Sequence, residues 1–200
     1  MNEIDQHEYL NYINGEFTHG SNKEKVPVEN PANEKIVSFA PKGSAEDARS
    51  ALEAASGAKV SWAKLPAIDR SKLVFKLAKE IRGEREKLAK IIVLEQGKPL
   101  DQAEGEVDAT ANFLEYAAEQ ARRIEGEIFP SDNQSEDIWI RRAPYGVVVA
   151  LTAWNYPMAL VGRKLGPALV AGNTVVLKGH EITPLSGLEI ARLADRVGFP

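Results

Sequence analysis

Residues 142–181 decide the fold of this chain, and they read RAPYGVVVALTAWNYPMALVGRKLGPALVAGNTVVLKGHE. Val147 to Thr152 is continuously apolar or β-branched, as expected of a parallel strand that is covered on both faces. A helical stretch follows from about Met158 to Val170, and Thr174 to Leu177 repeats the strand pattern. Gly172-Asn173 supplies the intervening turn, because both residue types tolerate left-handed backbone. The stretch therefore predicts a right-handed βαβ unit of an α/β fold.

The first 62 residues predict a small hairpin, an irregular arm and one helix. Short extended pieces flank Asn14-Gly15, a dipeptide that favours a tight turn between two strands. Ser44 and Asp47 have the spacing of a capping box, with Asp in place of the usual Glu or Gln. The helix that they start runs to about Trp62, and its apolar stripe is Ala48, Leu52 and Ala55.

Three more helices are predicted between residues 66 and 121. Apolar residues at helical spacing on either side of Gly83 predict two helices that pack side by side, the first starting near Pro66. After Gly97-Lys98-Pro99 a longer helix follows, with the apolar stripe Leu100, Ala103, Val107, Ala111, Leu114, Ala118 and Ala121. Its acidic residues have no histidine beside them, so we interpret them as a solvated face and not as a metal site: Asp101, Glu104, Glu106 and Asp108.

The segment from Glu125 to Arg142 changes to the period of a strand. Apolar and polar residues alternate on both sides of a polar turn, Ser131 to Asp137, as in an antiparallel ribbon. A two-stranded ribbon is marginal in water, so its apolar face needs a cover. That cover is either the parent domain or another subunit, and the residues alone leave both interpretations open.

Composition excludes several classes of function. The chain has 25 basic and 29 acidic residues and a net charge of -4, which predicts no partnership with nucleic acid or with an anionic membrane. Its N-terminus lacks the pattern of a secretory signal, and its apolar runs are too short to span a bilayer, so we expect a cytoplasmic protein. It contains no cysteine, which excludes disulfides, thiolate metal sites and a cysteine nucleophile within these residues.

Ligands of doubly wound sheets bind beyond the carboxyl ends of the strands, so the loop after each predicted strand is a candidate site. The first loop contains Thr152, Trp154 and Asn155. The primary amide of Asn155 could donate a hydrogen bond to an oxygen that gains negative charge. It could instead be the N-cap of the following helix, and the pattern alone favours that simpler interpretation.

The second loop contains Lys178 and Glu181, a cation and a hydrogen-bond acceptor three residues apart. They could hold the two hydroxyls of a ribose, or they could form a surface salt bridge at the start of a helix. Lys164, on the predicted crossover helix, is by default a solvated residue, and His180 lacks partners at metal-ligand spacing. The glycines do not form the GxGxxG fingerprint of dinucleotide-binding domains.

Several motifs together resemble the NAD(P)-dependent aldehyde dehydrogenase superfamily. They are Trp-Asn-Tyr-Pro at 154–157, Gly-Pro-Ala-Leu at 166–169, Ala-Gly-Asn-Thr-Val-Val at 171–176, Lys178 with Glu181, and upstream Glu-Gln-Gly-Lys-Pro at 95–99, Trp62 and Asn-Pro-Ala at 30–32. The resemblance covers residues 12–200. Within the superfamily, the sequence is most similar to the bacterial lactaldehyde and glycolaldehyde dehydrogenase branch. It implies an aldehyde dehydrogenase-like α/β fold with an incomplete Rossmann-type NAD-binding domain.

The resemblance also implies roles for single residues. Asn155 would stabilise the oxyanion of a thiohemiacetal, and Lys164 would lie near the proton-relay path. Lys178 and Glu181 would hold the adenosine ribose, while Thr152 and Trp154 would line the nucleotide through their backbones. The cofactor would be NAD, with NADP possible, and the substrate a small-molecule aldehyde. The ribbon at 125–142 would join subunits of a homo-oligomer.

Two departures from the family pattern occur in the site loops: Ala153 replaces a usual proline, and Gly179-His180 replaces a common Pro-Ser. In full-length members the catalytic cysteine and glutamate lie C-terminal to the position of Pro200. The expectation is therefore an N-terminal fragment, inactive alone, with an arm and helices of the NAD-binding domain at 1–124, the ribbon at 125–142 and the first βαβ part at 143–200. The alternative is a non-catalytic remnant that associates with full-length subunits or binds nucleotide weakly.

Overall fold

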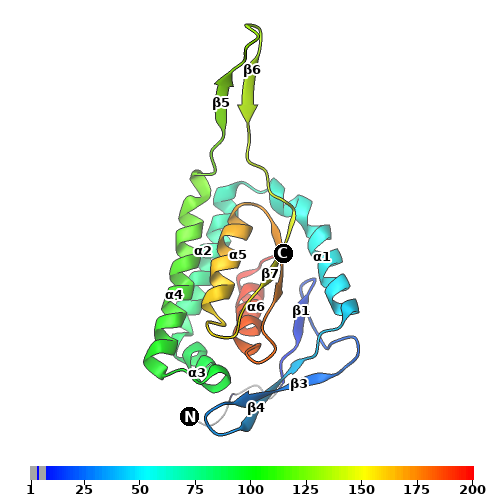
Figure 1. Ribbon diagram of the computed structural model, residues 1–200, viewed down its shortest axis with the longest axis vertical. Helices are drawn as coiled ribbons and strands as arrows, with labels where there is room; N and C mark the ends of the chain where they lie inside the picture. The colour runs from blue at the N-terminus through cyan, green and yellow to red at the C-terminus, as the bar shows by residue number, and fades with distance from the viewer. Residues whose placement is uncertain (1–3, 5–7) are drawn as a thin grey trace.

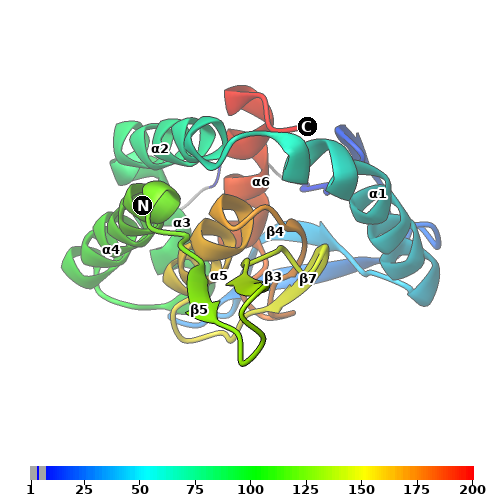
Figure 2. The ribbon, with the colours of Figure 1, turned by 90° about the horizontal axis from the view of Figure 1, so that it is seen from above.

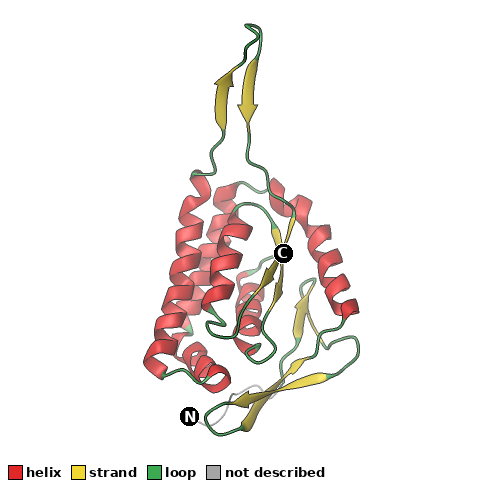
Figure 3. Ribbon diagram, viewed as in Figure 1, coloured by secondary structure: helices red, strands yellow, loops and turns green. Residues whose placement is uncertain are grey.

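The computed structural model describes residue 4 and residues 8–200 (Figure 1). The helices are α1 (Ala45–Lys64), α2 (Ala67–Gly83), α3 (Arg85–Gln96), α4 (Leu100–Glu119), the 3-10 helix η1 (Gln120–Arg122), α5 (Ala159–Val170) and α6 (Leu185–Val197). The strands are β1 (Asn11–Ile13), β2 (Glu16–Thr18), β3 (Lys25–Asn30), β4 (Lys35–Pro41), β5 (Glu127–Pro130), β6 (Asp137–Ile140), β7 (Val147–Leu151) and β8 (Thr174–Lys178). They form four separate pairs, β1-β2, β3-β4, β5-β6 and β7-β8 (Figure 3). The expectation of an irregular arm after the first hairpin was wrong, because β3 and β4 form a second antiparallel pair there.

The βαβ unit predicted from residues 142–181 is confirmed. β7 and β8 run parallel, with Val147 paired to Thr174 and Leu151 to Lys178, and α5 connects them. Helix α5 contacts the pair from one side and α1 from the other (Figure 2). The expectation that β7 is covered on both faces was wrong, because Val149 and Leu151 are 53% and 60% exposed. Each of these strands has a single strand neighbour, so part of the apolar pattern lacks a cover.

Helices α2 to α6 all contribute to the main core, in which α2 and α5 pack against α4. The predicted stripe of α4 is buried except at Leu100, which is 36% exposed. The two helices on either side of Gly83 do not pack mainly on each other, because α2 lies along α4. Helix α5 lies directly on α4: a Cβ added at Gly162 would stand 2.9 Å from Cγ2 of Thr110, and one at Gly166 would stand 2.8 Å from Cβ of Ala117.

Helix α1 begins with the predicted capping box. The Ser44 Oγ accepts from the Asp47 N–H at 3.1 Å, and the Asp47 Oδ2 accepts from the Ser44 N–H at 2.8 Å. Its predicted stripe was wrong, because Ala48 and Leu52 are exposed. The parallel sheet that α1 covers has only two strands, and the helix buries Trp62 near its carboxyl end instead.

Left-handed backbone occurs at two of the predicted turns. Asn14 and Gly15 have φ values of 55° and 77°, and they join β1 to β2 as expected. Gly172 has a φ of 98° after α5, but Asn173 does not share this conformation. The Asn173 side chain instead accepts a hydrogen bond from the Gly146 N–H at 3.0 Å, which ties the start of β7 to the start of β8.

The ribbon β5-β6 projects from one end of the molecule (Figure 1). Every residue of both strands is exposed, including Ile128 at 64% and Trp139 at 69%. Of the two covers left open by the sequence, packing of these strands on the described part of the chain is therefore excluded.

Candidate active site

The two loops predicted to form a site lie side by side. Leu151 and Lys178 are paired at the carboxyl ends of β7 and β8. One residue further, the Thr152 N–H donates to the Lys178 carbonyl at 3.2 Å. The strand order therefore places the segment with Thr152, Trp154 and Asn155 next to the segment that begins at Lys178.

Asn155 is not the N-cap of α5. The helix begins at Ala159 with Met158 as its N-cap residue, and no side chain of the cap residue bonds to the first turn. Asn155 is exposed, and its amide makes no hydrogen bond within residues 8–200. The structure thus removes the simpler interpretation of this residue and leaves its amide available to a ligand.

Lys178 and Glu181 do not form the surface salt bridge that the sequence allowed. The Lys178 Nζ donates to the Gly179 carbonyl at 3.2 Å, and the exposed Glu181 has neither ion pair nor hydrogen bond within the described part of the chain. Glu181 lies in a tight turn that His180 and Thr183 close, in which the Thr183 N–H donates to the His180 carbonyl at 3.2 Å. Lys164 is also exposed on α5, and it makes no hydrogen bond or ion pair with Asn155.

The interpretation of Glu106 as part of a solvated face was wrong. Glu106 is 3% exposed and forms an ion pair with Lys98, which is 9% exposed. Its Oε1 also accepts from the N–H groups of Met158 and Ala159 at 2.9 and 3.1 Å. A signal was available in the sequence, because Glu106 follows the stripe residue Ala103 by three positions, which places it on the same helix face.

Glu95 plays a similar part at the second loop. Its carboxylate accepts hydrogen bonds from the Leu185 N–H at 2.7 Å, from the Ser186 N–H at 2.9 Å and from the Ser186 hydroxyl. These groups form the first turn of α6, whose N-cap residue Pro184 supplies no side-chain cap. Glu95 and Lys98 both lie in the segment at 95–99, so this short segment contacts the ends of both site loops.

Burial should make the stability of the fold depend on Glu95. Desolvation raises the pKa of its carboxyl group from 4.5 to about 7, against the lowering effect of its hydrogen bonds with Ser186 and Leu185, and the charge of Glu106 adds to the rise. The folded state therefore holds a proton that the unfolded state releases, and the stability that this provides is lost as the pH rises through about 7.

We expect Glu95→Gln to flatten this pH dependence. From pH 5 to pH 8 the free energy of unfolding of the wild-type chain should fall by roughly 2 kcal/mol relative to that of the variant. Chemical denaturation of residues 1–200 at the two pH values measures the difference, and Glu86→Gln, at an exposed position of the same helix, is the matched control. Parallel pH curves for the wild type and Glu95→Gln would contradict the expectation.

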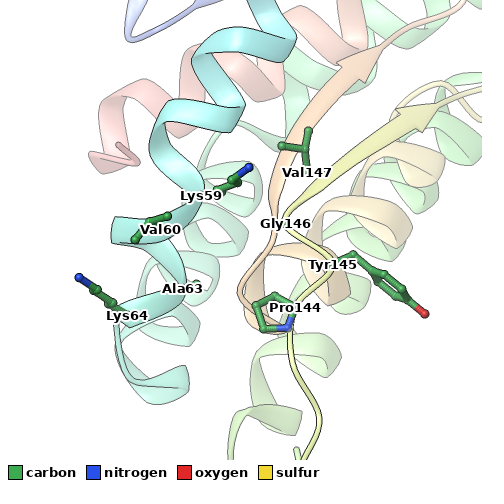
Figure 4. Close-up of a pocket in the computed structure, with 8 residues that line it drawn as sticks. All are labelled: Lys59, Val60, Ala63, Lys64, Pro144, Tyr145, Gly146 and Val147. Atoms are coloured by element: carbon green, nitrogen blue, oxygen red, sulfur yellow. The ribbon is translucent and has the colours of Figure 1, made fainter.

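The described part of the chain offers no metal site, and the pocket shown in Figure 4 lies away from the candidate site. Residues 8–200 contain no group of three or more histidine, cysteine or acidic side chains placed to hold a metal ion, and none of their helices is long and apolar enough to cross a membrane. An open pocket lies between α1 and the segment before β7, lined by residues such as Lys59, Lys64 and Tyr145 (Figure 4). It adjoins the amino end of β7, opposite the candidate site.

Comparison with known proteins shows which family the sequence matches. A model of the aldehyde dehydrogenase family matches residues 17–200. The chain is 47% identical over 192 residues to 3,6-anhydro-alpha-L-galactose dehydrogenase of Vibrio sp. (strain EJY3), covering 96% of this chain and 40% of that protein. It is 41% identical over 189 residues to lactaldehyde dehydrogenase of Escherichia coli (strain K12), with coverage of 94% and 40%. The chain thus spans about 40% of the length of these relatives.

A solved structure has the same fold over the matched residues. The crystal structure of PnpE in complex with nicotinamide adenine dinucleotide superposes with a TM-score of 0.93 at 36% sequence identity. The match covers 96% of this chain and 39% of that one. The predicted α/β fold is therefore confirmed over nearly the whole chain.

Proposed function

This chain belongs to the aldehyde dehydrogenase family, and on that premise we propose that it is the N-terminal part of an NAD-dependent enzyme that oxidises an aldehyde to a carboxylate. The observation that carries the proposal is the pairing of Leu151 with Lys178. It brings a free side-chain amide, a cation and a carboxylate to one edge of the sheet, and each has a task in that reaction.

Asn155 acts on the substrate. A thiolate that lies outside these residues attacks the aldehyde carbon, and the carbonyl oxygen gains negative charge as the carbon–sulfur bond forms. A donor held at that position stabilises the oxyanion. The unbonded, exposed amide of Asn155 meets this requirement without breaking a contact of the fold. Lys164 of α5 lies near the path by which a proton leaves.

Lys178 and Glu181 hold the cofactor. Glu181, exposed and without a partner in the described part of the chain, accepts hydrogen bonds from the ribose hydroxyls, and Lys178 supplies a cation beside it. Thr152 and Trp154 contribute backbone groups along the nucleotide. Bound NAD supplies the hydride acceptor. A carboxylate at this point would repel a 2′-phosphate, so NAD is preferred and NADP is the alternative.

Glu181→Ala tests the cofactor assignment. In the longer protein that contains this chain we expect the Michaelis constant for NAD to rise about 10-fold or more, because a charged hydrogen-bond acceptor is lost, while turnover at saturating NAD changes little. Glu119→Ala, at an exposed glutamate at the end of α4, is the control and should leave both constants unchanged. An unaltered Michaelis constant in Glu181→Ala would refute the ribose contact.

The ribbon is the proposed contact between subunits. Its exposed apolar side chains have no cover in the described part of the chain, and a second copy of the protein would supply one. The proposed domain organisation then has three parts. They are an arm with helices of the NAD-binding domain at 1–124, the ribbon at 125–142 and the first βαβ part of the NAD-binding domain at 143–200. We place the enzyme in the cytoplasm, with a small-molecule aldehyde as substrate.

The exposed ribbon also supports a second candidate function. A chain without cysteine could act as a non-catalytic module that joins full-length subunits through β5-β6 or binds nucleotide weakly. The two candidates differ in the residues beyond position 200. An uninterrupted reading frame that supplies a glycine loop, a glutamate and a cysteine supports the enzyme, and a stop codon supports the module.

A further inference from the structure

The loop that carries Asn155 is held from the protein side by a buried ion pair. Lys98 follows the left-handed Gly97 at the end of α3, and Glu106 lies on the buried face of α4. The side chains of both residues are almost completely buried, at 8% and 0% exposed. The two residues reach the loop after β7 from elements 50 or more positions earlier in the chain.

Glu106 replaces the cap that α5 does not have in its own sequence. The first N–H groups of a helix have no partner within the helix, and its N-terminus carries a partial positive charge. The Glu106 Oε1 accepts from Met158 at 2.9 Å and from Ala159 at 3.1 Å. The position of the first turn of α5 is therefore fixed relative to α4.

Lys98 connects Glu106 to the loop that carries Asn155. Its Nζ pairs with the second carboxylate oxygen of Glu106 and donates to the carbonyl of Asn155 at 3.1 Å. It also lies 4.0 Å from the centre of the Tyr156 ring, within range of a cation–π contact. Lys98 thus binds the backbone of the residue whose side-chain amide faces the reaction, and of no other residue in the described chain.

A buried ion pair is a costly way to gain stability alone. Two charges lose their hydration on burial, and apolar residues of similar volume often serve stability as well or better. What the pair gives here is geometry, because one cation and one carboxylate fix three backbone groups of a short segment at 155–159. The exposed loop would otherwise be free to move at the end of β7.

We propose that Lys98 and Glu106 are positioning residues that orient the Asn155 amide for oxyanion stabilisation. The proposal rests on the proposed function, since it assigns a supporting role to residues behind that site. Neither residue touches substrate or cofactor in this assignment. Their contribution is exerted through the backbone of Asn155 and through the first turn of α5.

The test uses the double variant Lys98→Met/Glu106→Gln. The replacement pair is neutral and of similar size, so no unpaired charge is left in the core, and the glutamine oxygen can still accept from Met158 and Ala159. The double variant removes the ion pair itself, the bond from Lys98 to the Asn155 carbonyl and the cation over Tyr156. The matched control is Glu104→Gln, the same change on α4 at a half-buried position whose partner is Arg85.

Hydrogen exchange of residues 1–200 gives the first readout. We expect the amides of residues 158–162, which are hydrogen-bonded to Glu106, Tyr156 and Met158, to exchange about 10-fold faster in the double variant, while peptides from α2 keep the wild-type rate. Glu104→Gln should exchange as the wild type does. Unchanged exchange of this segment in the double variant would overturn the proposal. So would a uniform increase over the whole chain, because that indicates general loss of stability.

Kinetics of the longer protein give the second readout. The double variant should lower turnover about 10-fold and leave the Michaelis constant for NAD within about twofold, because misplacing a reacting group costs turnover. In the Asn155→Ala background the same double variant should lower turnover no further. An equal loss in both backgrounds would show that the pair acts independently of Asn155 and would overturn the proposal.

Different results would refute the proposed function and the positioning role of Lys98 and Glu106. A longer wild-type protein that oxidises no aldehyde refutes the proposed function, and hydrogen exchange of residues 1–200 then still decides whether the pair orders the loop. A longer protein that is active, with a double variant that matches it in turnover, refutes only the positioning role.

Discussion

Asn155→Ala should lower the turnover of the longer enzyme by about 100-fold or more, because removal of one oxyanion donor typically has an effect of this size. The Michaelis constant for NAD should stay close to the wild-type value, since the proposed ribose contacts lie on the other loop. Steady-state kinetics with the aldehyde varied at saturating NAD measure the loss.

The structure makes this variant unusually clean. The Asn155 amide is exposed and makes no hydrogen bond within residues 8–200, so its removal breaks no contact of the fold. Thermal unfolding of Asn155→Ala should therefore match the wild type. Asn155→Asp is the companion variant: it keeps the shape, removes the donor and adds a negative charge beside the developing oxyanion, so its turnover should be at least as low. Turnover within twofold of the wild type in either variant would remove Asn155 from the reaction.

The largest expected difference is between the activity of residues 1–200 alone and that of the longer protein. Residues 1–200 contain no cysteine, and the proposed reaction needs a thiolate to attack the aldehyde. We expect no reduction of NAD by this chain with any aldehyde, at protein concentrations at which the longer protein reduces NAD readily. Absorbance of the reduced cofactor measures both. Sustained NAD reduction by purified residues 1–200 would show that another nucleophile or mechanism operates.

Local sequence rules predicted the elements of the fold well, because those elements depend on local physics. The β-branched runs around α5, the Asn14-Gly15 turn and the Ser44 capping box all gave the structures expected of them. The β3-β4 pair was missed, since the segment that contains it was expected to be an irregular arm. The other errors arose where burial depends on distant neighbours. Leu151 has the residue type of a doubly covered strand, yet it is 60% exposed, because β7 has only β8 as a strand neighbour in the described part of the chain.

The position of the candidate site could be predicted from the sequence, but the roles of its residues could not. The parallel-strand rule brought Thr152 next to Lys178 without any knowledge of side-chain contacts. The roles of Asn155 and Glu181, by contrast, came from the resemblance, because an exposed amide and an exposed carboxylate have many uses.

The supporting residues could not be identified from local pattern. Lys98 bonds to the Asn155 carbonyl across 57 positions of the chain, and no periodicity encodes such a contact. Glu106 did carry a signal, its place on the buried face of α4, but a carboxylate in an acidic helix resembles a solvated one until its partners are known.

The coding sequence downstream of codon 200 decides between the two proposed functions, the N-terminal part of an enzyme and a non-catalytic module. If this chain is the N-terminal part of an aldehyde dehydrogenase, the reading frame continues without interruption and encodes a glycine-containing loop, a glutamate and a cysteine nucleophile to face Asn155. A stop codon directly after Pro200 in the native transcript would contradict the proposed enzyme.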